Sequence, residues 1–311
     1  IAFGGRGVAR VIDVGEVSAT LEVRTVDEAL GVDFTARYTL YDRLDHLDIV
    51  NDVARADFLH TPAELRYREN VFVAFPFLVP GFGFRVEYAP GVLDPANDFF
   101  ASAADFVVAN RWVDVASDEF GVTLVPHEAP AMHCGQINYN QLEARFHAST
   151  SHLYSYAWSN RMAGLITLAP EDFQTRLSYS IRPHRGSWRE GGAPGFGWEQ
   201  AAPLLPVSGP VLAGGDGAER SFLSVGEPDV QLTVFKQAER PGDGYVARLA
   251  EVGGRDHPAV SLCLQVGPVE RAWLCDGVEN ALRELPVQSA NRVTLPLGKF
   301  DLATIRFCIA K

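Results

Sequence analysis

The chain has 311 residues, 47% of them hydrophobic and 21% charged, which suffices for one large core or two ordinary ones. Its net charge of -12 opposes the phosphates of nucleic acids and anionic lipids, so we expect no nucleic acid and no membrane among its partners. No apolar run approaches the ~20 residues of a membrane helix. We therefore expect a soluble, cytoplasmic globular protein. Because the chain opens at Ile1 rather than Met, we expect a piece of something longer.

Short segments of alternating polarity fill the first fifty residues. In 32–41, aromatic and aliphatic side chains share one face, while Thr35, Arg37 and Thr39 share the other. This alternation predicts a half-buried antiparallel strand. The same pattern predicts strands over 8–14, 17–24 and 46–53.

The most apolar run of the chain covers 71–79. Pro76 and Pro80 interrupt it, and because proline cannot donate to a β-ladder, the strand must end or bend there. A strand over 84–88 and a turn at Gly91 and Val92 are predicted next. For 61–68 the composition predicts a turn of helix or a connector.

The stretch 105–130 predicts a β-hairpin. Residues with high β-propensity flank the polar corner 116–119, and Gly121 follows directly. Period-2 counting places Trp112 on the same face as Val108, so we expect a single first arm that is covered on both faces.

Two further strand pairs are predicted, 131–137 with 142–147 and 153–158 with 176–183. The last segment alternates cleanly between apolar and polar residues, so one face should be buried.

Residues 186–220 are dense in glycine and proline and could hold at most a short helix around 198–202. We place the domain boundary here, with domains over 1–208 and 209–311 and a linker over 209–220. Seven short strands at even spacing then predict a small β-sandwich, with Pro-Gly-Asp-Gly at 241–244 as a hairpin turn. The strands cover 222–225, 230–235, 245–251, 260–266, 270–275, 292–297 and 304–309.

Several short motifs, in order along the chain, resemble the C-terminal β-region of glycoside hydrolase family 38, the α-mannosidase family. The best marked are RWVDV at 111–115 and GVTL at 121–124, which flank a short acidic turn. The further segments that resemble the family are 38–53, 71–79, 84–92, Tyr154 with Ser155 and Asn160, 177–184, Lys236, 246–251 and 300–307.

This resemblance implies an all-β chain, with a galactose-mutarotase-like supersandwich followed by a small β-sandwich domain. In the family, a separate N-terminal α/β domain carries an Asp nucleophile and a zinc ion held by His and Asp. Nothing in this sequence reads as that domain. We therefore expect no catalytic residue, no metal ligand and no cofactor in this chain, and zinc in the missing catalytic domain. The parent protein would be a retaining α-mannosidase-like glycosidase, and this chain alone would be inactive.

A few polar residues are candidates for a carbohydrate-facing surface. The first group, Trp158, Asn160 and Arg161, combines an aromatic ring with an amide and a guanidinium, which suits a sugar face and its hydroxyls. The second group, His133, Asn138 and Tyr139, lies near a predicted strand-turn corner. For both groups a structural role is the alternative. The candidates are Trp158, Asn160, Arg161, His133, Asn138 and Tyr139.

Two other features have structural interpretations. His46-Leu47-Asp48 matches the family's His-x-Asp zinc motif superficially, but it lies inside an alternating strand, and a metal site would need two further convergent ligands. The four cysteines form no Cys-x-x-Cys pair, so we expect buried thiols, with an inter-strand disulfide left open.

Two functions follow. The first is the non-catalytic C-terminal β-portion of an alpha-mannosidase-like glycoside hydrolase, which supports the protein's own N-terminal catalytic domain and shapes the carbohydrate cleft. The alternative is a stand-alone carbohydrate-binding or aldose-epimerase-like module, because a fold by itself does not determine function. An upstream domain bearing His-x-Asp would decide for the first.

Overall fold

The computed structural model describes nine stretches of the chain, in which one α-helix, α1 (Ala193–Ala201), accompanies many β-strands. The predicted all-β fold class is confirmed. In these stretches no helix combines the length and the apolar character needed to cross a membrane. The described residues are 7–28, 31–55, 70–89, 91–98, 107–137, 146–159, 173–206, 221–265 and 267–310.

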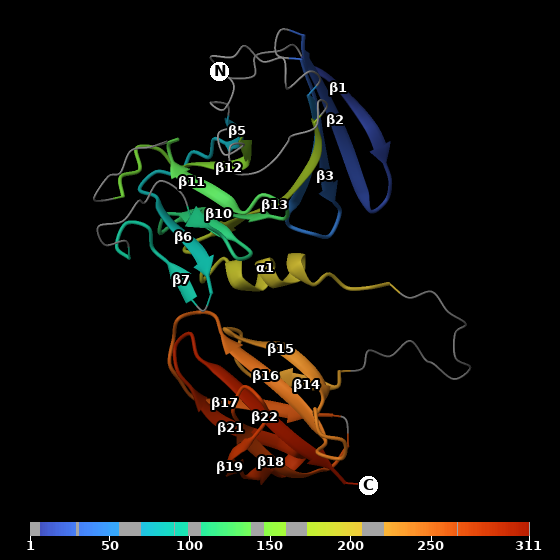
Figure 1. Ribbon diagram of the computed structural model, residues 1–311, viewed down its shortest axis with the longest axis vertical. Coiled ribbons are helices and arrows are strands. Elements are labelled where there is room, and N and C mark those ends of the chain that lie inside the picture. Colours follow the sequence, from blue (N-terminus) through green and yellow to red (C-terminus); the bar gives the residue numbers. More distant parts are fainter. Residues whose placement is uncertain are drawn as a thin grey trace, which may run out of the picture. The chain divides into compact units, whose positions relative to one another are not determined.

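The chain forms two compact units, coloured mainly blue to yellow and mainly orange to red in Figure 1. The first unit comprises Ile1–Ala89 and Leu93–Pro203, and the second comprises Pro90–Val92 and Leu204–Lys311. The predicted linker 209–220 lies outside the described residues, as does the predicted connector 61–68.

A nine-stranded antiparallel sheet dominates the first unit, in the order β1-β2-β3-β4-β13-β10-β9-β6-β7. A four-stranded sheet has the order β5-β12-β11-β8. The strands of the large sheet are β1 (Gly7–Val14), β2 (Ser18–Asp27), β3 (Val32–Tyr41), β4 (Leu47–Arg55), β6 (Gly83–Tyr88), β7 (Gly91–Leu93), β9 (Val113–Ala116), β10 (Phe120–Pro126) and β13 (Phe173–Arg185). Those of the small sheet are β5 (Asn70–Phe75), β8 (Val107–Val108), β11 (Ala131–Gly135) and β12 (His152–Ser159).

The core of the first unit is shared by both sheets. Leu124 and Tyr179 from the large sheet and Met132 and Leu153 from the small one are at most 1% exposed and belong to one apolar cluster. Burying a side chain of this size stabilises the fold by about 1.5–3 kcal/mol. The two sheets therefore form a sandwich, held together mainly by the apolar faces of their strands.

The central hairpin is confirmed in its second half and corrected in its first. β9 and β10 pair with Ala116 opposite Gly121. The expected single first arm is instead two short strands in different sheets, β8 and β9. Between them the backbone leaves the small sheet, and Trp112 stacks on Trp188 with ring centroids 5.5 Å apart. Counting by period 2 failed here because the chain changes sheet between Val108 and Val113.

The predicted strand pairs were wrong in their partners. β12 pairs with β11 and β5, while β13 pairs with β10 and β4. The turn expected at Gly91 is the short strand β7. Alternation shows which face of a strand is buried, but it does not specify the neighbouring strand. Of the segment 142–147, only the last two residues are described, and they are not in a strand.

The helix α1 begins earlier than the expected 198–202. Gly192 caps it with a positive φ of 66°, a conformation that glycine adopts without strain, and a proline occupies its first turn. A Cβ on Gly197 would lie 2.6 Å from Trp112 Cδ1, so the helix can pack this closely only with glycine there.

The second unit is a smaller sandwich of two antiparallel sheets, with orders β14-β17-β21-β20 and β15-β16-β22-β18-β19. Both contribute to one core that includes Leu249, Leu262 and Phe307, each 0% exposed. All seven predicted strands are present. The two missed strands, β19 and β20, are short and mostly exposed. The bounds are β14 (Leu223–Val225), β15 (Val230–Gln237), β16 (Tyr245–Glu251), β17 (His257–Leu264), β18 (Val269–Cys275), β19 (Ala281–Leu285), β20 (Val287–Gln288), β21 (Arg292–Leu297) and β22 (Leu302–Ile309), with the 3-10 turn η2 (Ser289–Asn291).

The predicted hairpin turn at 241–244 joins β15 to β16, whose ends pair at Gln237 and Tyr245. All four cysteines are free thiols; Cys134 and Cys275 are buried as expected, whereas Cys263 and Cys308 are only half-buried.

Candidate functional site

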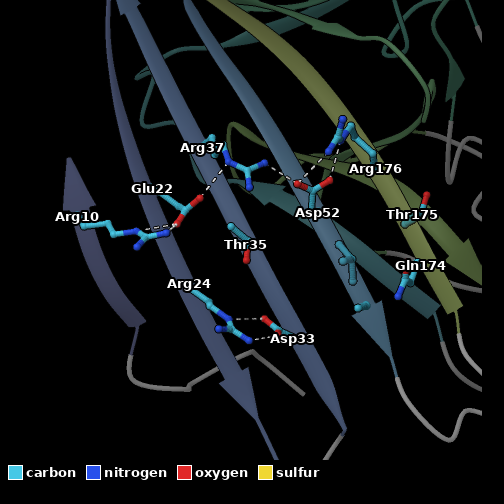
Figure 2. Close-up of a pocket in the computed structure, with 12 residues that line it drawn as sticks. Arg10, Glu22, Arg24, Asp33, Thr35, Arg37, Asp52, Gln174, Thr175 and Arg176 are labelled. Atoms are coloured by element: carbon cyan, nitrogen blue, oxygen red, sulfur yellow. Dashed lines mark hydrogen bonds and ion pairs between the residues drawn. The ribbon is translucent and has the colours of Figure 1, made fainter. Parts of the chain in front are cut away.

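One face of the nine-stranded sheet is polar across five neighbouring strands, β1 to β4 and β13 (Figure 2). Residues directly opposite each other on paired strands point to the same face. Arg10 is paired with Glu22, Glu22 with Arg37, and Asp52 with Arg176. The opposite face of β3, β4 and β13 enters the core.

These five side chains form a continuous series of ion pairs, which we call the ladder. Arg10 Nη2 lies 2.7 Å from Glu22 Oε1, and Arg37 Nε lies 3.0 Å from Glu22 Oε2. Arg37 Nη1 lies 2.6 Å from Asp52 Oδ2, and Arg176 Nε lies 2.7 Å from Asp52 Oδ1. Each carboxylate therefore bridges two guanidinium groups and is held in one orientation.

The ladder borders an open hollow of about 660 Å³, with the ion pair of Arg24 and Asp33 on its lower side (Figure 2). Four arginines and three carboxylates line it, so its net charge is 4 − 3 = +1 in a chain of net charge -12. The lining residues include no aromatic ring. The hollow thus offers many hydrogen-bond donors and acceptors but no apolar platform.

The electrostatics of the hollow keep its carboxylates ionised. The hydrogen bond from Arg10 lowers the pKa of Glu22, and Arg24 does the same for Asp33. Arg176, followed by Arg37, lowers the pKa of Asp52. A glycosidase requires a carboxyl of raised pKa as its general acid. The hollow can therefore bind and orient hydroxyl groups, but it holds no carboxyl suited to protonate a leaving group.

The other end of the same polar face is covered by α1 and the turn before it. Ser180 Oγ donates to Asp48 Oδ1 at 2.6 Å and lies 3.0 Å from Gln200 Oε1 of the helix. Arg182 Nη2 donates to the carbonyl oxygens of Gly191 and Gly192 at 2.7 and 2.8 Å. These hydrogen bonds hold α1 and the preceding turn on the sheet, so that they cover this end of the polar face and not the end that carries the ladder.

A buried carboxylate lies beneath this cover. Asp114 Oδ2 accepts hydrogen bonds from Thr123 Oγ1 and from His184 Nε2, both at 2.7 Å. The side chains of Asp114 and His184 are 1% and 5% exposed. Burial disfavours protonation of His184, but the hydrogen bond and charge of Asp114 outweigh it, so the pKa of His184 is raised. Its enclosed position suits a structural cross-link between β9, β10 and β13 better than a role with substrate.

Of the six predicted carbohydrate-facing residues, His133 alone has a described side chain. It lies on β11, is 1% exposed, and packs against the rings of Phe72 and Tyr156 at centroid distances of 5.1 and 6.3 Å. The backbone of Trp158 pairs with Val71 at the end of β12. Its side chain, together with Asn160, Arg161, Asn138 and Tyr139, lies outside the described residues. Their role stays a prediction.

The sequence reasoning missed the ladder, although a signal was present. Charged residues recur with period 2 at Glu22 and Arg24 and again at Asp33 and Arg37. Such a pattern normally indicates a solvated face, and only the strand order brings opposite charges into register across five strands.

The pair His46 and Asp48 does not fit the zinc of the family's His-x-Asp motif. His46 Nε2 and Asp48 Oδ1 are 3.6 Å apart, and the two oxygens of Asp48 already accept hydrogen bonds from the hydroxyls of Ser180 and Tyr41 at 2.6 Å each. The His46 ring packs between the rings of Tyr41 and Phe196. The structural interpretation of this motif agrees with its surroundings.

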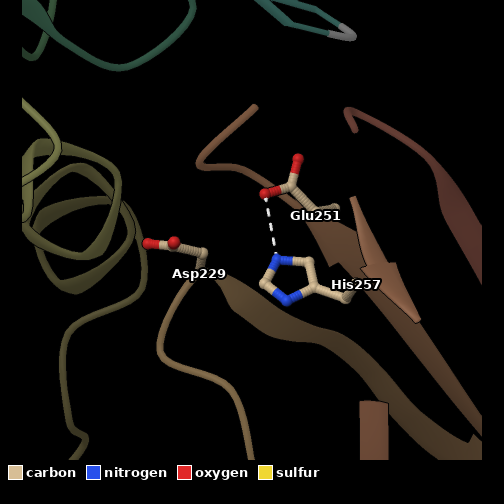
Figure 3. A group of neighbouring side chains, drawn as sticks. All are labelled: Asp229, Glu251 and His257. Carbon is tan, nitrogen blue, oxygen red and sulfur yellow. Dashed lines mark ion pairs between the residues drawn. The ribbon is translucent and has the colours of Figure 1, made fainter. Parts of the chain in front are cut away.

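A different set of residues, in the second unit, has ligand atoms close enough to share a metal ion. Asp229, Glu251 and His257 each offer one ligand atom within 4.8 Å of the others (Figure 3). Asp229 directly precedes β15, Glu251 ends β16, and His257 begins β17. In the described part of the chain this is the one such group.

Comparison with known proteins bears on both units. Residues 229–305 match the family model described as the glycosyl hydrolases family 38 C-terminal beta sandwich domain. Residues 229–305 thus carry the C-terminal β-sandwich domain of glycoside hydrolase family 38. The chain is also similar to Alpha-mannosidase 2C1 of Mus musculus, with 28% identity over 203 residues, which cover 64% of this chain and 18% of the mouse protein.

Two crystal structures extend the likeness to nearly the whole chain. One is an alpha-mannosidase from Enterococcus faecalis V583, with a TM-score of 0.66, 12% identity, and coverage of 98% of this chain and 35% of that one. The other is a family 38 glycosyl hydrolase protein from Enterococcus faecalis, with a TM-score of 0.65, 12% identity and coverage of 98% and 37%. At this identity the match shows the fold alone. The chain spans between about a fifth and about two fifths of the length of these three proteins.

Proposed function

We propose that this chain is the non-catalytic β-portion of an alpha-mannosidase-like glycoside hydrolase, in which it supports the catalytic domain and shapes one wall of the carbohydrate cleft. The observation that carries the proposal is the match of 98% of the chain to 35% of an alpha-mannosidase structure. The zinc and the nucleophile of the hydrolase would belong to the catalytic domain.

The chemistry of the hollow supports a binding rather than a catalytic role. Removing roughly 20 kcal/mol from the barrier of glycosidic hydrolysis requires a placed nucleophile and a general acid. Glu22, Asp33 and Asp52 are each paired with arginine, which holds their pKa values low. Their fixed donors and acceptors suit the hydroxyl groups of a sugar.

The surface of the first unit supports a covering partner, which we propose to be the catalytic domain. β1 is an edge strand of the large sheet and is exposed along its whole length. Val8 and Val14 are 71% and 74% exposed. Apolar edge strands are normally covered or paired, because their free backbone groups recruit other strands.

The test is to assay the purified 311-residue chain against an aryl α-mannoside with added zinc or cobalt, beside a full-length family 38 α-mannosidase as positive control. We expect no turnover by the chain. Turnover that disappears in an Asp52→Asn variant, with Asp118→Asn as the matched exposed control, would move catalysis into this chain and refute the proposal. Interconversion of the anomers of an aldose by the purified chain, measured by polarimetry, would instead favour the stand-alone aldose-epimerase-like module.

A further inference from the structure

His257 lies among carboxylates in the second unit without a hydrogen bond to any of them. Its Nε2 is 3.5 Å from Glu251 Oε1, and its Nδ1 is 3.8 Å from Glu227 Oε2. Within the described residues Nε2 is buried and lacks a hydrogen-bond partner, and the side chain is 12% exposed. A buried imidazole nitrogen directed at a carboxylate, yet too far for a hydrogen bond, leaves a ligand atom unused.

Glu251 is fixed in place by the backbone. Its side chain is 0% exposed. Oε2 accepts the amides of Gly254 at 2.9 Å and Phe300 at 2.7 Å, and Oε1 accepts those of Gly253 at 2.9 Å and Arg255 at 3.2 Å. Metal-ligating carboxylates are commonly held by such outer hydrogen bonds. The longest of the four lies on Oε1, the atom that faces His257, so a cation at Oε1 would displace the weakest bond.

Asp229 completes the group and provides access from solvent. Its side chain is 20% exposed, and Oδ2 lies 3.1 Å from Arg255 Nη1. Figure 3 shows the Asp229 carboxylate pointing away from the His257 imidazole. Arg255 is 59% exposed, so it can move away when Asp229 turns inward.

We propose that Asp229, Glu251 and His257 form a binding site for a divalent transition-metal ion. The ion would be held by Asp229, Glu251 Oε1 and His257 Nε2, with water completing its coordination. The carboxylates of Glu227, Asp229 and Glu251 gather here with the guanidinium of Arg255, so these four charges sum to −3 + 1 = −2 and favour a dication. An imidazole among carboxylates suits zinc or cobalt better than calcium or magnesium.

The site would connect the two sheets of the small sandwich. Asp229 and Glu251 adjoin β15 and β16 of one sheet, and His257 begins β17 of the other. Glu227, near His257 Nδ1, would orient the imidazole as an outer carboxylate. Because a metal that binds only the folded state stabilises it by mass action, the ion should raise the melting temperature of this unit.

The test is calorimetric titration of the chelator-treated chain with zinc, repeated with cobalt and calcium. We expect one zinc site, no calcium binding, and a melting temperature that rises with zinc. Cobalt should give visible absorption without the intense near-ultraviolet band of thiolate ligands, which excludes the free cysteines. His257→Gln and Asp229→Asn should abolish binding, and Glu227→Gln should weaken it about 10–100-fold.

Arg255→Gln separates the proposal from a purely structural cluster. The substitution frees Asp229 from its ion pair, so we expect tighter zinc binding, even if the variant is less stable without metal. His147→Gln and Glu270→Gln, which change exposed residues elsewhere, serve as controls and should bind like the unsubstituted chain. Absence of stoichiometric zinc binding would overturn the proposal, and so would binding that survives in Asp229→Asn and does not change in Arg255→Gln.

Discussion

The buried carboxylate of Asp114 provides the sharpest test of how the first unit is held together. Asp114→Asn preserves the size of the side chain and removes its charge. Asp114 is 1% exposed and accepts two hydrogen bonds at 2.7 Å, from Thr123 and His184. Water therefore cannot reach this site to form new hydrogen bonds when the substitution weakens those with Thr123 and His184.

The size of the effect follows from the change in hydrogen-bond strength. A hydrogen bond to a charged group contributes about 1.5–3 kcal/mol, and a neutral one about 0.5–1.5 kcal/mol. Two bonds thus lose roughly 1 kcal/mol each, so at pH 6 we expect Asp114→Asn to lower the free energy of unfolding by about 2 kcal/mol.

The effect should depend on pH because of His184. Burial lowers the pKa of His184, but the hydrogen bond and charge of Asp114 raise it by more than burial lowers it. The folded-state pKa therefore lies above the ordinary value of 6.5. The stabilisation is fully present below the unfolded-state pKa and is lost as the pH rises through the raised folded-state value. The difference between the unsubstituted chain and Asp114→Asn should therefore be smaller at pH 9 than at pH 6.

The assay is urea unfolding followed by tryptophan fluorescence at pH 6 and pH 9. Four of the five tryptophans, Trp112, Trp158, Trp188 and Trp198, belong to the first unit, so this signal reports mainly on it. A double-mutant cycle with His184→Gln isolates the coupling of the pair. Asp118→Asn, on the exposed hairpin turn, is the control. A difference that stays constant or grows between pH 6 and pH 9 would refute the reasoning.

Three further predictions use the same unfolding measurements. Gly121→Ala would place a Cβ 2.4 Å from Ala116 Cβ and 2.6 Å from His184 Cε1, so we expect the free energy of unfolding to fall by about 1–3 kcal/mol. Gly83→Ala is the control and should have a small effect, because the atom nearest to its new Cβ is the flexible end of Arg85 at 3.5 Å. Equal effects of the two substitutions would contradict this prediction. Phe307→Ala removes a side chain that is 0% exposed and should destabilise the second unit by about 3–5 kcal/mol, measured by circular dichroism. The fluorescence transition of the first unit should not move. A shift of both transitions would argue against independent unfolding of the two units. Asp52→Asn breaks the partly exposed ion pairs with Arg37 and Arg176 and should lower the free energy of unfolding by less than about 1 kcal/mol at neutral pH. The difference should vanish in acid, because the pKa of Asp52 is lowered in the folded state. A larger cost would indicate a cooperative ladder.

The sequence by itself determined the fold class, the position of most strands and the face that each buries. The strands β3, β16 and β21 have the predicted bounds, because polarity with period 2 is a property of each segment alone. The family resemblance was readable for a similar reason, since its motifs are short and local.

The tertiary structure alone decided which strands pair and which side chains meet. The break between β8 and β9, the pairing of β13 with β4 and β10, and the position of Trp112 against Trp188 depend on which sheet each segment joins. The ladder exists because five strands from both ends of the first unit lie in one order, and His184 meets Asp114 across 70 positions of sequence. Strand order is set by the closure of a common core, a long-range condition that no alternating segment contains, so the charges, the buried pair and the metal-binding group could be located only in the folded chain.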